Sequence, residues 1–163
     1  MQKGFQYLMD LKELYQEIIL DHGKNPRNKK ICEDFNKQAK GHNPLCGDKV
    51  HIYLRVNKDK KVEDISFEGE GCAISIASAS IMTEVLKGKE FNLSKKILDD
   101  FLKMLKDGTK FQVNSLKENE KISMMSLSGV KKFPMRVKCA TLAWHTFIHA
   151  VEEKKINANT EKV

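Results

Sequence analysis

The chain is organised around the stretch Asn43-Pro44-Leu45-Cys46-Gly47-Asp48. It places a thiol and a carboxylate two residues apart on a loop, and Gly47 between them permits a sharp bend because it has no side chain. A thiolate and a carboxylate that face one centre can form half of a metal site. The same residues also fit an ordinary turn capped by Asp48, so the choice depends on the other cysteines.

A regular strand follows this loop directly. From Val50 to Val56, apolar residues alternate with polar ones, a pattern typical of a half-buried strand. A turn at 57–60 and a second apolar run at 62–68 predict an antiparallel hairpin. A weaker pattern within 34–41 indicates a short strand ahead of the loop.

Helical spacing of apolar residues dominates the rest of the chain. We expect residues 1–7 to be a loose lead-in and Asp10 to cap a first helix that ends at Gly23, because Glu13 completes a capping box. Ser94 is the expected cap of a third helix that Gly108 ends. Further helices are predicted over 73–87, about 116–127 and 134–153.

Composition indicates a single cytosolic domain. The chain has 163 residues, of which 40% are hydrophobic, and its sequence shows neither a signal peptide nor a membrane span. The net charge of +7 comes mostly from lysine, with few arginines and no basic stripe interleaved with aromatic residues, so we expect no nucleic-acid partner. We predict one domain over 1–153 and a polar, flexible tail over 154–163.

The cysteines carry the functional signal. In a reducing cytosol, widely spaced cysteines are more often ligands or nucleophiles than disulfides. Cys72 and Cys139 lie at the starts of two predicted helices, where the helix dipole favours a thiolate. If both helices pack on one sheet with their N-termini at the same end, these thiols meet Cys46 and Asp48. The result is a Cys3Asp site suited to zinc or iron–sulfur chemistry. Cys32 has no metal-like spacing and is interpreted as a bystander.

Charge and histidines add two constraints. Three thiolates and one carboxylate around a divalent ion leave a net negative charge, which Arg136, Lys138 and Lys49 are placed to offset. The pair His145 and His149 is spaced for metal binding but lacks the glutamate of a metalloprotease motif, so it is the weaker candidate. His42 and His51 flank the loop and are candidates for supporting the ligands.

Three ordered blocks resemble one known family. The resemblance to the IscU/NifU-N/SufU family rests on Asn43-Pro44-Leu45-Cys46-Gly47-Asp48, Gly71-Cys72-Ala73-Ile74-Ser75 and Arg136-Val137-Lys138-Cys139-Ala140-Thr141-Leu142-Ala143-Trp144. It covers most of the chain and implies an α+β fold, with a small antiparallel three-stranded sheet, helices packed on one face and a metal site at one exposed end. Lys138, where the scaffold branch has histidine, and the long segment from about 88 to 133 are similar to the SufU branch.

The resemblance also implies roles. Cys46, Asp48, Cys72 and Cys139 correspond to zinc ligands, and Cys46 to the thiol that accepts sulfur. The implied partner is a cysteine desulfurase that uses pyridoxal phosphate, and Arg136 matches a position tied to its docking. The chain would then be a sulfurtransferase-type carrier in iron–sulfur cluster assembly, upstream of SufBCD-type machinery. The carbon–sulfur cleavage would belong to the partner.

Two other functions remain open on the sequence. The first is a scaffold that assembles a transient [2Fe–2S] cluster on the same four ligands, and the aspartate oxygen would suit a labile cluster. The second is a structural zinc domain, against which the mixed Cys3Asp set argues because structural zinc sites generally use only Cys and His.

Overall fold

The hairpin predicted after the Cys46 loop is the centre of the sheet. Strands β1 (Lys37–Asn43), β2 (Asp48–Val56) and β3 (Val62–Glu70) pair antiparallel, with Asn43 opposite Asp48 and Lys49 opposite Glu70. The three predicted antiparallel strands are therefore confirmed. A short fourth strand, β4 (Asn157–Asn159), pairs parallel with β1, so the sheet order is β3-β2-β1-β4.

The structure is a computed structural model that describes residues 2–112, 114–152 and 157–159. Most of the segment 154–163 lies outside this range, and its predicted flexibility stays a prediction. Among the described helices, none is both long and apolar enough to cross a membrane.

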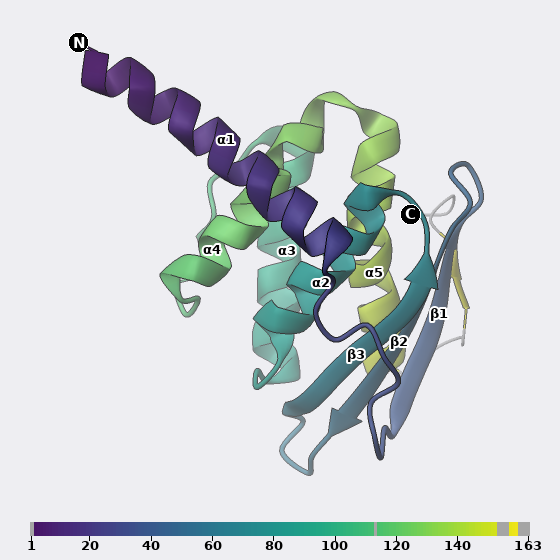
Figure 1. Cartoon of the computed structure of the whole chain (residues 1–163). Helices are drawn as coiled ribbons and strands as arrows, with labels where there is room; N and C mark the ends of the chain where they lie inside the picture. The colour runs from purple at the N-terminus through teal and green to yellow at the C-terminus, as the bar shows by residue number, and fades with distance from the viewer. Residues whose placement is uncertain (1, 113, 153–156, 160–163) are drawn as a thin grey trace.

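Helices cover one face of the sheet (Figure 1). They are α1 (Gln2–Lys24), α2 (Ala73–Leu86), α3 (Phe91–Asp107), α4 (Glu118–Met125) and α5 (Pro134–Glu152), with a 3-10 turn η1 (Ser126–Lys132) before α5. Alternate residues of β2 and β3 point into this layer, and Ile52, Leu54 and Phe67 are completely buried. Their burial supplies the apolar contact that holds the helices to the sheet.

Helix α2 is the central support of the helical layer because its small residues let other elements approach closely. It contacts α1, α5 and β3. The Ser78 hydroxyl donates to the Ala140 carbonyl at 2.5 Å, and the Trp144 indole Nε1 donates to Ser78 Oγ at 3.0 Å. These buried hydrogen bonds join α2 to the first half of α5, so the two helix starts are fixed relative to each other.

Some predicted helix boundaries are wrong. Helix α1 already begins at Gln2, because helix-forming residues continue upstream and Asp10 lies inside the helix. Helix α3 begins at Phe91, and Ser94 is a buried helical residue whose hydroxyl donates to the Glu90 carbonyl. Gly108 does end α3, in the left-handed conformation with φ 77°. The weak helix expected near 116–127 divides into α4 and η1.

Candidate metal and sulfur site

The loop between β1 and β2 presents Cys46 to solvent. Its four residues, 44–47, are closed by the Gly47 N–H, which donates to the Asn43 carbonyl at 2.8 Å. Gly47 has φ 72°, a conformation that favours glycine, and no atom stands within 4 Å of where its Cβ would be. Cys46 is exposed and Leu45 is 52% exposed. The acceptor thiol predicted from the sequence is thus on an open, sharply bent loop.

Asp48, at the start of β2, is completely buried and tied to the start of α2. Its Oδ1 accepts the backbone N–H of Cys72 at 2.9 Å. A Cβ on Gly71 would overlap this oxygen, so the glycine makes the space for the carboxylate. Within the described residues, Oδ2 is buried with no hydrogen-bond partner. A buried orphan carboxylate oxygen is costly unless another group binds it.

Cys139 completes a close group with these two residues. It lies in the second turn of α5, is 1% exposed, and its Sγ is 3.5 Å from Cys46 Sγ. One ligand atom each from Cys46, Asp48 and Cys139 can be chosen so that all lie within 4.8 Å of one another. This spacing is what a single ion bound by thiolate and carboxylate requires.

Cys72 stands beside this group rather than inside it. It is the half-buried N-cap of α2, and its thiol reaches Cys139 closely enough to affect the pKa of that group. The three-residue group whose ligand atoms all lie within 4.8 Å does not include it. We refer to Cys46, Asp48, Cys72 and Cys139 together as the thiol site.

Electrostatics at the thiol site differ from the expectation for helix starts. Burial raises the pKa of the Cys139 thiol, and its contacts with Asp48, Cys46 and Cys72 raise it further. Thiolates and a carboxylate packed this closely need a positive charge among them. Together with the orphan Asp48 oxygen, this donor set fits a thiophilic divalent ion such as zinc.

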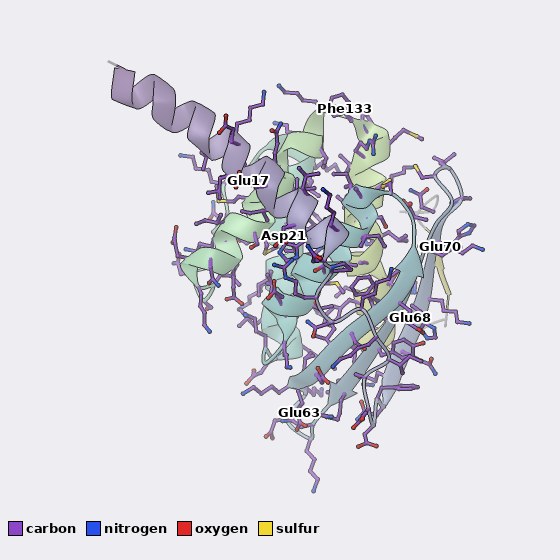
Figure 2. All side chains as sticks on the ribbon, viewed as in Figure 1. Glu17, Asp21, Glu63, Glu68, Glu70 and Phe133 are labelled. Atoms are coloured by element: carbon purple, nitrogen blue, oxygen red, sulfur yellow. The ribbon has the colours of Figure 1, made fainter. Side chains whose placement is uncertain are left out.

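Arg136 lies at the outer rim of the site. It is exposed in the first turn of α5, and its backbone N–H donates to the Phe133 carbonyl at 2.8 Å. Phe133, labelled at the top of the molecule in Figure 2, is 59% exposed, and Met135 is 49% exposed. An exposed guanidinium among exposed apolar side chains is the composition typical of a protein contact surface.

The other candidate residues lie outside the close group. Neither His145 nor His149 belongs to it, and burial lowers the pKa of His145. His51 bonds to Gln38 and stacks on Tyr53, so it is occupied elsewhere on the sheet. Cys32 is 2% exposed, and burial raises the pKa of its thiol. These positions are consistent with structural roles.

Asn43 is a site residue that the sequence analysis did not single out. It is completely buried, and its amide Nδ2 lies 3.8 Å from Cys139 Sγ. The sequence did offer one indication of its role. Asn43 precedes Pro44 at the end of a predicted strand, where an asparagine side chain commonly bonds to the backbone of the turn. Its contact with a residue 96 positions away was not available from the sequence.

Comparisons with known proteins agree with this geometry. The profile described as "NifU-like N terminal domain" matches residues 14–140. The chain is 39% identical over 146 residues to the zinc-dependent sulfurtransferase SufU of Bacillus subtilis, covering 90% of this chain and 95% of that protein. It is 35% identical to the iron–sulfur cluster assembly scaffold protein IscU of Streptococcus pyogenes, covering 89% and 87%.

A solved structure has the same fold. It is the putative iron–sulfur cluster assembly scaffold protein for the SUF system from Fervidobacterium islandicum AW-1. The TM-score is 0.72 with 35% identity, over 83% of this chain and 94% of that one. The predicted α+β fold is therefore confirmed.

Proposed function

Since the chain belongs to the family of NifU-like N-terminal domains, we propose that it is a zinc-dependent sulfur carrier that receives persulfide sulfur from a cysteine desulfurase. The observation that carries the proposal is the contrast within the close group. Cys46 is exposed on a bent loop, whereas Asp48 and Cys139 are buried on regular elements. One ligand can move, and the others are held.

The thiol site supplies the groups that this activity needs. Cys46, Asp48, Cys72 and Cys139 would hold zinc, which keeps a bound thiolate deprotonated. In the transfer step, the Cys46 thiolate attacks the outer sulfur of the partner's persulfide. A new S–S bond forms on Cys46, the old one breaks, and the partner's cysteine leaves as a thiolate. No acid–base residue of this chain is required.

The partner surface follows from the same geometry. A desulfurase that delivers sulfur to Cys46 must cover the loop and the rim formed by Leu45, Phe133, Met135 and Arg136, which is exposed in the isolated chain. Arg136 would contribute charge to this docking. The carried sulfur would then pass to SufBCD-type assembly machinery.

A cluster scaffold is the second candidate because a relative of similar identity is named as one. It would use the same four residues. Lys138 favours sulfur transfer. The scaffold branch of the family has histidine at this position, and the lysine is similar to the SufU branch instead. The two functions predict different metal contents and different effects on the desulfurase.

The deciding experiment uses anaerobically purified protein. Zinc and iron are measured, and desulfurase turnover with cysteine is followed with and without this chain. The proposal expects one tightly held zinc, faster turnover, and persulfide on Cys46 that is absent in Cys46→Ser. Cys32→Ser is the control and should behave as wild type. A stable cluster without faster turnover favours the scaffold, and persulfide found on Cys139 alone would refute the acceptor assignment.

A further inference from the structure

Asn43 connects the exposed Cys46 loop of the thiol site to the buried Cys139. Its backbone carbonyl accepts the Gly47 N–H at 2.8 Å, and its side-chain Oδ1 accepts the Leu45 N–H at 3.3 Å. Both bonds shape the loop that carries Cys46. The bond from Leu45 also sets the orientation of the amide, because the oxygen must face that N–H. The Nδ2 group is consequently turned toward Cys139.

The side chain is buried enough for this orientation to matter. Asn43 is 0% exposed, and Nδ2 lies 3.8 Å from Cys139 Sγ, within the range of a hydrogen bond to sulfur. An N–H group that points at a sulfur draws electron density from it. The sulfur then becomes a weaker nucleophile, and it binds a metal with less charge donation.

We propose that Asn43 is a positioning residue that directs incoming sulfur to Cys46 and away from Cys139. The proposal rests on the proposed sulfur transfer only for the identity of the incoming group. Selection is needed because the two sulfur atoms are 3.5 Å apart, so an outer sulfur that reaches one is within a short distance of the other. Asn43 shapes the loop that exposes Cys46 and donates to the sulfur that must stay on the metal.

Two variants separate the donor from the rest of the side chain. Asn43→Asp keeps an oxygen for the Leu45 N–H and removes the N–H donor. Asn43→Ser removes the amide N–H without adding charge, and its shorter side chain still offers a hydroxyl oxygen to the Leu45 N–H. The matched control is Asn36→Asp, because the Asn36 amide likewise donates to the Val56 carbonyl at 2.8 Å and accepts the Val56 N–H at 3.0 Å, but away from the thiol site.

The first measurement is the competition between the two sulfurs in the zinc-bound protein, where both are thiolates and their reactivity follows electron density rather than protonation. Limiting iodoacetamide is added, and alkylation of Cys46 and Cys139 is quantified by peptide mass spectrometry. We expect the share of Cys139 to rise about fivefold in both Asn43 variants, the factor that one ordinary hydrogen bond contributes. Asn36→Asp should match wild type.

The second measurement is spectroscopic and uses the cobalt-substituted protein. Loss of the N–H donor makes Cys139 a better electron donor, so the sulfur-to-cobalt charge-transfer band should move to lower energy in the Asn43 variants. A role limited to loop structure would not move this band in a correctly folded variant. Folded variants with unchanged alkylation shares and an unchanged band would overturn the proposal.

A measurement on the wild-type chain covers the case in which the variants do not fold. In cadmium-113-substituted, nitrogen-15-labelled protein, the Asn43 side-chain proton should show scalar coupling to cadmium through the sulfur. Observed coupling supports the inference, and its absence overturns it. Sulfur uptake by wild type is assayed separately, so failure of the proposed transfer can be distinguished from failure of the Asn43 inference.

Discussion

Two polar clusters rest on α2, and they differ in how well their groups are satisfied. In the thiol site, Asp48 Oδ2 has no partner among the described residues, and burial together with the neighbouring Asp48, Cys46 and Cys72 raises the pKa of Cys139. The second, which we call the His22 cluster, comprises His22, Arg27, Asn28, Ser80 and Thr83. There, Ser80 Oγ lies 2.7 Å from His22 Nδ1 and accepts the Arg27 backbone N–H at 2.8 Å.

This difference distinguishes a binding site from a cluster that only holds helices together. The His22 cluster is complete without a ligand: Asn28 Nδ2 donates to Thr83 Oγ1, and Thr83 Oγ1 donates to the Ser80 carbonyl. It fixes the end of α1, the helix on which Figure 2 labels Asp21, and the following segment to α2. The thiol site is incomplete without a cation. Among the described residues, Ser66 Oγ and His149 Nδ1 are also buried without a hydrogen-bond partner, but Asp48 Oδ2 is the one that lies in a group of possible metal ligands.

The largest expected effect follows from replacing the orphan oxygen. Asp48→Asn keeps an acceptor for the Cys72 N–H but removes the charged ligand atom. We expect zinc affinity to fall about 1000-fold, more than the 10- to 100-fold typical for loss of a supporting hydrogen bond. Chelator competition measures the affinity, and urea unfolding shows whether the metal-free variant is folded.

Ser80→Ala is the reciprocal control in the His22 cluster. It should leave zinc affinity unchanged and lower the free energy of unfolding by about 1–3 kcal/mol, because His22 and the Arg27 N–H lose their common partner. If Ser80→Ala weakened zinc binding as much as Asp48→Asn, the distinction between the two clusters would be wrong.

The next effect is a pH dependence specific to the His22 cluster. Burial and the nearby Arg27 charge lower the pKa of His22 to about 4, while Asp21 opposes the shift and Glu84 Oε1 lies 3.6 Å from Nε2. The unfolded chain, with a pKa near 6.5, therefore binds the proton more readily. Stability is retained above about pH 6.5 and falls by about 3 kcal/mol as the pH drops to about 4.

Urea unfolding of the metal-free protein at several pH values tests this. His22→Gln should reduce the pH dependence by that amount, since the other titrating groups are unchanged. An identical pH profile for wild type and His22→Gln would contradict the assigned role of His22.

Smaller effects on stability and zinc affinity are expected from substitutions at two glycines of the thiol site. In Gly71→Ala the new Cβ would overlap Asp48 Oδ1, so the carboxylate must move. We expect a loss of about 1–3 kcal/mol in stability and a drop in zinc affinity of about tenfold or more. Gly47→Ala has free space and is strained only by its φ of 72°, so it should cost about 1 kcal/mol and leave zinc affinity nearly unchanged. Equal zinc affinities in the two variants would show that Asp48 adjusts freely.

Much of the site could be predicted because its residues lie beside turns and near the starts of strands and helices. Cys46 and Asp48 flank a glycine turn at a strand start, and Cys72 and Cys139 lie near helix starts, so local patterns were sufficient to place them at one end. Patterns could not show that Cys72 stands beside the closest group, because this depends on how α2 packs against β3 and α5.

Tertiary contacts explain the other differences. His22 lies near the end of its helix, yet it is 4% exposed and bonded to a serine 58 positions away. Ser94 has the residue type of a cap but is buried inside α3. Strand β4 pairs parallel with β1 through a short polar segment, which has no alternating apolar pattern to reveal it. In each case the deciding interaction is distant in the sequence.

The sequence separation of the ligands has a consequence for folding thermodynamics. Asp48 meets Cys72 across 24 positions, and Cys46 meets Cys139 across 93, so the donor set exists only once the hairpin, α2 and α5 have assembled. An ion held there would act as a cross-link that closes two long loops. Its binding free energy would add to the stability of the folded chain by mass action, and the melting temperature would rise with the logarithm of free zinc. Metal occupancy would thereby report the fraction of molecules that are completely folded.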